Sequence, residues 1–125
     1  MPNTSPTPLV YACSGCSNVA QLANSIALSL DQHGDAEMSC IAGVGGHVPK
    51  LVKTAKSGRL IIAIDGCALA CVANCLKQHD IKANNHIILS ELGLKKRYKA
   101  AFSETECATI TANIRSNITH LKKND

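Results

Sequence analysis

Seven cysteines stand out in this chain of 125 residues, and their spacing determines the chemistry they can perform. Cys13 and Cys16 form a Cys-x-x-Cys pair, Cys67 and Cys71 are four residues apart, and Cys40 lies between the two pairs. Thiolates are preferred ligands of zinc, which takes four ligands in a structural site. A thiolate is also the nucleophile of redox and sulfur-transfer chemistry. Either role requires the fold to bring these cysteines to a common place.

The apolar pattern predicts the elements that position them. Short apolar runs predict strands over residues 9–12, 37–42, 60–64 and 86–89. Helical periodicity and capping residues predict helices over residues 18–33, from 49 to about 56, over 68–79 and over 104–121, with a flexible glycine-rich turn at 43–46.

This alternation of strands and helices is typical of an α/β fold. We expect a single three-layer domain, in which a four-stranded parallel sheet of strand order 2-1-3-4 carries helices on both faces. The domain is expected to span residues 9–125, and the proline-containing residues 1–8 are expected to form a disordered tail.

Five cysteines follow the carboxyl ends of three predicted strands. Cys13 and Cys16 follow the first strand, Cys40 ends the second, and Cys67 and Cys71 follow the third. Parallel strands end at one edge of their sheet, and this edge is where open α/β sheets bind ligands. We therefore expect the five cysteines to meet there and to bind a metal ion, zinc being the best guess.

Helix geometry narrows the ligand set. Cys67 and Cys71 are expected one turn apart at a helix start, where their side chains share a face and the helix N-terminus favours thiolate. Cys75 lies at the margin of the expected ligand set. Its Cα would be roughly 12 Å from that of Cys67 along the helix axis, too far for both to bind one ion without distortion. Cys107 falls on the apolar side of the last helix, so packing is its expected role. The expected ligands are Cys13, Cys16, Cys40 and Cys67, with Cys71 competing for a place.

Three alternatives remain open beside zinc. Cys16 or Cys67 could serve as the nucleophile of a thiol redox or sulfur-transfer enzyme. Four cysteines are also the usual ligands of an iron–sulfur cluster. A third alternative is an interaction module that uses the basic run at residues 95–99.

Composition and sequence pattern argue against nucleic-acid binding, a membrane span and a disulfide framework. Aromatic residues make up only 2% of the chain, which argues against the stacking platforms of nucleic-acid binders. No apolar stretch approaches the length of a membrane span. An odd number of cysteines argues against a closed disulfide framework. The N-terminal residues do not resemble a signal peptide, so the expected location is the cytoplasm.

Polar residues near the cysteines are expected to have mainly structural roles. Asp65 is expected to accept backbone hydrogen bonds in the tight turn before Cys67, or to orient a ligand. His47 is expected to be exposed, and His79 and His86 have no visible partner in the sequence.

Three blocks of sequence resemble the signatures of the DGC-domain family, which is named for Asp-Gly-Cys. They are residues 13–18 (Cys-Ser-Gly-Cys-Ser-Asn), 38–46 (Met-Ser-Cys-Ile-Ala-Gly-Val-Gly-Gly) and 64–71 (Ile-Asp-Gly-Cys-Ala-Leu-Ala-Cys). Residues 91–98 resemble a later segment of the family, so the resemblance covers about residues 9–100. Ala68 stands where relatives often have proline. The family is described as zinc-binding because of its cysteines, and the resemblance implies the same for this chain.

Overall fold

The computed structural model describes residues 7–123, so the expected tail lies mostly outside it, in residues 1–6. The strands are β1 (Leu9–Ala12), β2 (Glu37–Met38), β3 (Ile61–Asp65) and β4 (Asn85–Ile88). The helices are α1 (Asn18–Gln32), α2 (Ile41–Gly45), α3 (Pro49–Ala55), α4 (Cys71–Lys77), the short 3-10 helix η1 (Leu89–Leu92) and α5 (Glu104–Lys123).

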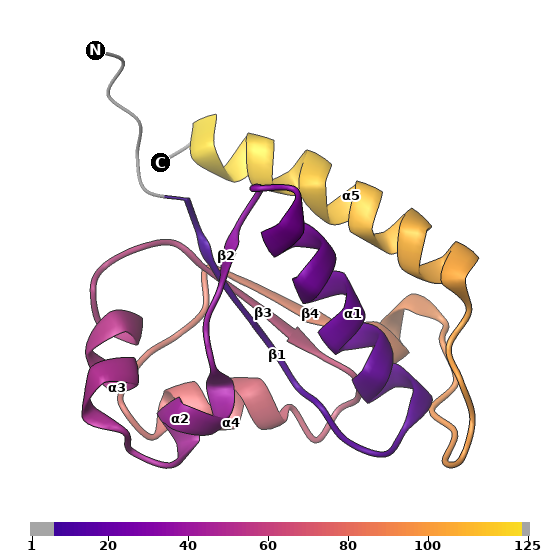
Figure 1. Ribbon diagram of the computed structural model, residues 1–125, viewed down its shortest axis with the longest axis horizontal. Coiled ribbons are helices and arrows are strands. Elements are labelled where there is room, and N and C mark those ends of the chain that lie inside the picture. Colours follow the sequence, from indigo (N-terminus) through magenta and orange to yellow (C-terminus); the bar gives the residue numbers. More distant parts are fainter. Residues whose placement is uncertain (1–6, 124–125) are drawn as a thin grey trace.

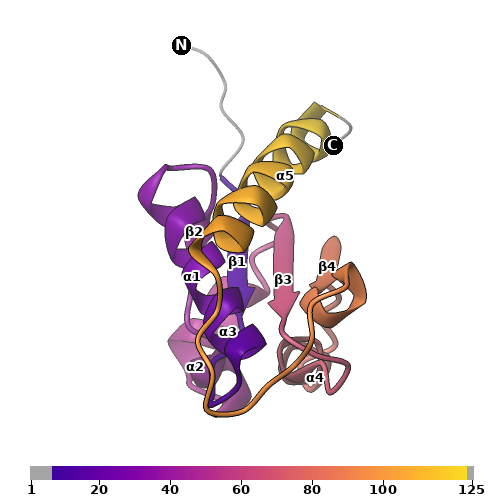
Figure 2. The ribbon, with the colours of Figure 1, turned by 90° about the vertical axis from the view of Figure 1, so that its right-hand side faces the viewer.

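The four strands form one parallel sheet in the predicted order, β2-β1-β3-β4. Leu9 of β1 pairs with Glu37 of β2 on one side and with Ile61 of β3 on the other. Figure 2 shows the four strands in this order. The loops that follow β1 and β3 consequently lie at the same end of the sheet (Figure 1).

Helices cover both faces of the sheet and give the three layers that the sequence predicts. Val10 and Ile62 pack in the core formed with α1 and α5, whereas Tyr11 and Ala63 pack in the core formed with α2, α3 and α4. Both strands are buried throughout, so alternate side chains fill both cores. Burial of each large aliphatic side chain contributes about 1.5–3 kcal/mol. None of the helices within residues 7–123 is long and apolar enough to cross a membrane.

The second strand is shorter than predicted. A strand reaching residue 42 is wrong, because β2 ends after two residues. The Ser39 N–H donates to the Val10 carbonyl oxygen, and Cys40 then becomes the N-cap of α2. The stretch 43–46 is therefore mostly helical instead of a flexible turn. A Cβ at Gly43 would overlap the end of the Leu51 side chain, so this glycine lets α3 pack closely against α2.

The third predicted helix begins late, at Cys71 instead of residue 68. Residues 67–70 form a turn closed by a 3.0 Å hydrogen bond from the Ala70 N–H to the Cys67 carbonyl oxygen. Ala70 has a left-handed φ of 51°, which separates this turn from α4. Cys67 and Cys71 do not share a helix, so the predicted pairing across one helical turn is wrong. Only Cys71 lies at the N-terminus of α4.

Candidate functional site

Strand topology places the five predicted site cysteines after the carboxyl ends of three strands. Cys13 and Cys16 lie in the loop after β1, Cys40 follows β2, and Cys67 and Cys71 follow β3. Cys16, Cys40 and Cys71 are exposed, whereas Cys13 and Cys67 are partly buried. Reagents in solution therefore have access to this end of the sheet.

Asp65, the last residue of β3, organises the turn that carries Cys67. Its carboxylate is 1% exposed and accepts hydrogen bonds from the Val72 N–H (2.8 Å) and the Ala73 N–H (3.3 Å). These are free donors in the first turn of α4, so Asp65 caps a helix that lacks a capping side chain of its own. The expected structural role is confirmed, but the donors lie in α4 and not in the turn before Cys67.

His86 of β4 completes this arrangement. Its Nε2 lies 2.7 Å from the second carboxylate oxygen of Asp65, and about a third of its side chain (32%) is exposed. A buried carboxylate needs such partners, because an unpaired charge in a protein interior is strongly destabilising. Asp65 thus ties together β3, β4 and α4.

Gly66 brings the turn against the start of α1. A Cβ on this residue would lie 2.8 Å from the Val19 carbonyl carbon and 2.9 Å from the Ala20 nitrogen, so only glycine fits. The Gly66 N–H also donates to the sulfur of Cys13, at 3.1 Å. The same glycine therefore sets the spacing between the loops after β1 and β3.

Cys13 lies in an environment that favours its protonated form. Burial raises the pKa of its thiol, and negative charge on Asp65, Cys71 and Cys67 raises this pKa further. The N–H of Gly66 opposes these effects by favouring the thiolate. Cys13, Cys67 and Cys71 thus share one electrostatic neighbourhood.

Cys67 has a cation beside it. The Nζ of Lys96 lies 3.5 Å from the Cys67 sulfur and 5.1 Å from the centre of the Tyr98 ring. Interactions with Tyr98 and then with Cys67 raise the pKa of Lys96, so its ammonium group stays charged throughout the neutral range. The Lys96 ammonium group thus donates a hydrogen bond to the Cys67 sulfur.

A strap at residues 95–98 positions Lys96. Asn18, the first residue of α1, donates through its side-chain amide to the Lys95 carbonyl oxygen (2.9 Å) and accepts from the Arg97 N–H (2.6 Å). The Asn18 N–H also donates to the Arg97 carbonyl oxygen, at 2.9 Å. Figure 2 shows the orange loop between η1 and α5, which contains the strap, curving past the start of α1.

The two cysteines outside the predicted ligand set are placed by packing. Cys75 lies against α2, where a Cβ on Gly45 would be 2.8 Å from its sulfur. Cys107 is buried between α5 and α1, with its sulfur 3.4 Å from the Ser25 hydroxyl oxygen. The prediction that Cys107 is a packing residue is confirmed.

No three Cys, His, Asp or Glu side chains within residues 7–119 are arranged to hold a metal ion. The cysteines have the chemistry that zinc prefers, but a closed site needs four ligands around one point. The predicted zinc ligands therefore share one end of the sheet without forming a ready ligand set.

Sequence reasoning missed two contacts at this end of the sheet. The basic run at 95–99 was visible, yet charge alone does not say that Lys96 faces Cys67. His86 lacked a visible partner because Asp65 lies 21 residues away in the sequence. The sequence signal for the contact between Asp65 and His86 is an aspartate before Gly-Cys together with a histidine in the next predicted strand.

Comparison with known proteins identifies the family of this chain. The DGC domain family matches residues 9–114, which include every element from β1 into α5. The chain belongs to the DGC family. The three residues for which the DGC domain is named have separate roles here. Asp65 caps α4, Gly66 allows α1 to pack closely against the turn, and Cys67 supplies the thiol.

One curated relative of this DGC protein is the anaerobic and virulence modulator AnvM of Pseudomonas aeruginosa. The two are 67% identical over 93 residues, which are 74% of this chain and 71% of AnvM. No solved structure matches this DGC protein.

Proposed function

We propose that this DGC protein is a thiol-based modulator in which Cys67 is the reacting nucleophile. The observation that carries the proposal is the ammonium group of Lys96, 3.5 Å from the Cys67 sulfur. A thiolate attacks sulfur far faster than a thiol does, and a cation within hydrogen-bonding distance stabilises the thiolate. Cys67 is also partly exposed, so a second molecule can reach it.

The proposed reaction is thiol–disulfide exchange. The Cys67 thiolate attacks one sulfur of a disulfide in another molecule and forms a new S–S bond with it. The original S–S bond breaks, and its other sulfur leaves with the electron pair as a thiolate. Cys71, exposed at the start of α4, is the nearest cysteine in the sequence that can then attack the mixed disulfide.

The relative supports a regulatory interpretation of this chemistry. AnvM is named an anaerobic and virulence modulator, and 67% of the 93 aligned residues are identical in this chain. We infer that this chain, too, acts as a modulator. In this proposal, the oxidation state of its exposed thiols is the signal that it carries.

Mapping which cysteine reacts first tests the proposal. The fully reduced protein is mixed with a limiting amount of a small aromatic disulfide, and the modified residue is located by peptide mass spectrometry. We expect the label at Cys67, and we expect Cys67→Ser to remove the fast phase while Cys40→Ser, on another exposed cysteine, leaves it. A fast phase that survives Cys67→Ser would reject Cys67 as the nucleophile.

Zinc binding is the second candidate function, favoured by the shared electrostatic neighbourhood of Cys13, Cys67 and Cys71. The burial and neighbouring negative charge that raise the pKa of the Cys13 thiol would be offset by a bound dication. Because no three donors are arranged for a metal within residues 7–119, this candidate requires movement of the turns, with Cys16 and Cys40 as the other proposed ligands.

Metal analysis separates this candidate from an iron–sulfur cluster. Protein purified without added metal and without oxygen is analysed for zinc and iron, and its visible absorption is recorded. One equivalent of zinc that is lost in Cys13→Ser supports the zinc candidate. Iron with sulfide and a coloured sample would favour the cluster, and metal-free protein with unchanged folding in chelator would reject both.

A further inference from the structure

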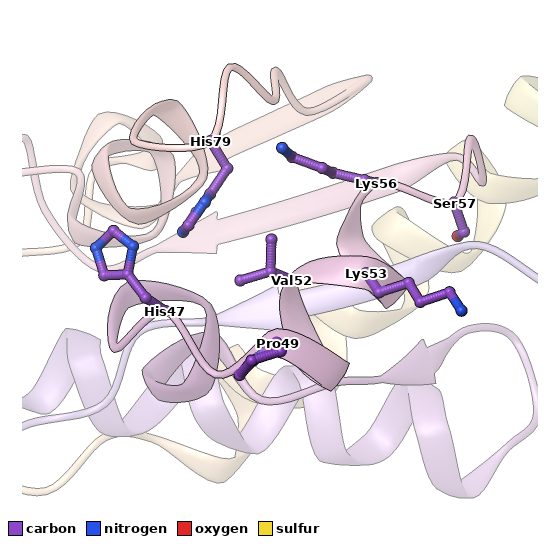
Figure 3. A pocket seen from close by; sticks show the side chains of 7 residues that line it. All are labelled: His47, Pro49, Val52, Lys53, Lys56, Ser57 and His79. Carbon is purple, nitrogen blue, oxygen red and sulfur yellow. The ribbon is translucent and has the colours of Figure 1, made fainter.

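A hollow of about 650 Å³ lies between α3 and the ends of α2 and α4, and none of the cysteines lines it. Its accessible wall is mostly apolar, with Pro49 and Val52 among the lining residues, and two histidines and two lysines supply its charged and polar groups. Figure 3 shows the rings of His47 and His79 side by side, with Val52 between them and the lysines. The residues that line it are His47, Pro49, Val52, Lys53, Lys56, Ser57 and His79.

The two histidine rings are held in defined positions. Their centres are 4.7 Å apart with an interplanar angle of 62°. His79 Nε2 donates to the Val44 carbonyl oxygen at 2.8 Å, and His47 Nε2 lies 2.8 Å from the side-chain oxygen of Gln78. Each ring therefore has only Nδ1 left for a ligand. His47 also has a left-handed φ of 60°, an uncommon conformation for a residue other than glycine.

The positive charge around the hollow lacks an acidic partner. No Asp or Glu is among the residues that line it. Asp80 lines an adjoining hollow together with Lys56, but none of the ion pairs found within residues 7–123 includes Lys53 or Lys56. In Figure 3 Lys56 extends toward the side of His79, whereas Lys53 extends away from the two rings. Unpaired cations around a hollow attract an anion.

We propose that this hollow binds a small organic phosphate. A phosphate monoester has about two negative charges and three terminal oxygens, which the Lys56 ammonium group and the free Nδ1 atoms of His47 and His79 can bind. Its organic part would rest on Pro49 and Val52, and Ser57 lies at the rim. This site shares no residue with the thiol centre, so the proposal stands whether or not Cys67 is the nucleophile.

The histidines also couple phosphate binding to the uptake of a proton, which can be measured. Because Nε2 of His79 already donates to a carbonyl oxygen, Nδ1 accepts in the neutral ring and donates only in the protonated ring. A bound phosphate therefore draws a proton onto Nδ1 of His47 or His79. Lys56 is the other charged group on the side of the rings, Lys53 lines the hollow but extends away from them, and Asp80 lies in the adjoining hollow.

Calorimetric titration of the full chain with phenyl phosphate tests the proposal. We expect saturable binding that weakens about tenfold in Lys56→Gln, the effect of losing one charge-assisted hydrogen bond. Lys50→Gln, on the same helix but outside the hollow, is expected to leave the affinity unchanged. Titrations in two buffers of different ionisation enthalpy should reveal proton uptake, and His47→Gln should reduce it.

Several results would overturn the proposal. These are the absence of saturable heat with phenyl phosphate, equal affinities of Lys56→Gln and Lys50→Gln, and binding without proton uptake above neutral pH. Inorganic phosphate that binds as tightly as phenyl phosphate would overturn the assignment of an organic ligand. Both lysine variants change exposed side chains, and a far-ultraviolet circular dichroism spectrum of each checks that the fold is retained.

Discussion

The Lys96 ammonium nitrogen lies 3.5 Å from the Cys67 sulfur, although the two residues are 29 positions apart in the chain. The contact depends on a third element, because the side chain of Asn18 at the start of α1 holds the backbone on both sides of Lys96. The environment of the proposed nucleophile thus depends on three segments: the turn after β3, the strap and the start of α1.

Asn18→Ala should slow the reaction of Cys67 without altering either reacting group. The substitution removes both side-chain hydrogen bonds to the strap, so Lys96 is held less firmly beside the sulfur. We expect a several-fold lower rate of reaction with a small disulfide and a loss of about 1–2 kcal/mol in the free energy of unfolding. Asn113→Ala, on the exposed surface of α5, is the matched control. Equal rates in the two variants would show that the strap does not position Lys96.

Gly66→Ala should destabilise the fold through a steric clash. The added Cβ would lie within 3.0 Å of backbone atoms of Val19 and Ala20, which no side-chain movement can relieve. Overpacking of this kind costs about 1–3 kcal/mol. Gly15→Ala is the control, because its Cβ would meet only the Ala20 Cβ, at 3.8 Å. Urea unfolding of both variants measures the difference, and similar midpoints would contradict the close packing at Gly66.

Asp65 and His86 should be energetically coupled. Asp65→Ala removes the cap of α4 and the partner of His86, at an expected cost of about 2–4 kcal/mol. His86→Ala leaves a carboxylate that is 1% exposed with only backbone donors. Because each single change leaves a group without its partner, the double variant should cost less than the sum of the two. Costs that simply add in urea unfolding would argue that the contact between Asp65 and His86 contributes nothing to stability.

Cys75 should make the fold more sensitive to alkali. Burial raises the pKa of its thiol, and negative charge on Cys71 and Asp65 raises this pKa further. The unfolded chain therefore loses this proton first, so the contribution to stability is complete below the ordinary cysteine value of 9.0 and is lost as pH rises through the folded pKa. In Cys75→Ala, the free energy of unfolding should fall less steeply above that value. Parallel pH profiles of the two proteins under reducing conditions would contradict the assignment.

The strands and long helices could be predicted because local signals and the fold agree. α1 was placed to within one residue, since Ser17 accepts from the Ala20 N–H as a capping residue and the buried side chains recur at helical spacing. The continuously buried β3 carries an apolar run that is typical of a central parallel strand. The predicted order 2-1-3-4 is common among doubly wound sheets, and the structure confirms it.

The start of α4 and the partners of the site could not be predicted in the same way. Ala68 and Leu69 favour helix, yet Asp65 caps α4 at Val72 and leaves the preceding residues in a turn. Local propensity carries no information about a cap supplied from another element. The contact of Lys96 with Cys67 likewise depends on tertiary structure, because a basic run predicts charge but not direction.

Comparing the rate at which Cys67 reacts in the native protein, in Lys96→Met and in Lys95→Met tests the proposed function most directly. The rate is measured near neutral pH with a small aromatic disulfide, and peptide mapping confirms the modified residue. We predict a rate about tenfold lower in Lys96→Met, because the thiolate loses its cation, and a nearly native rate in Lys95→Met. Equal rates in all three proteins would contradict the claim that Lys96 activates Cys67.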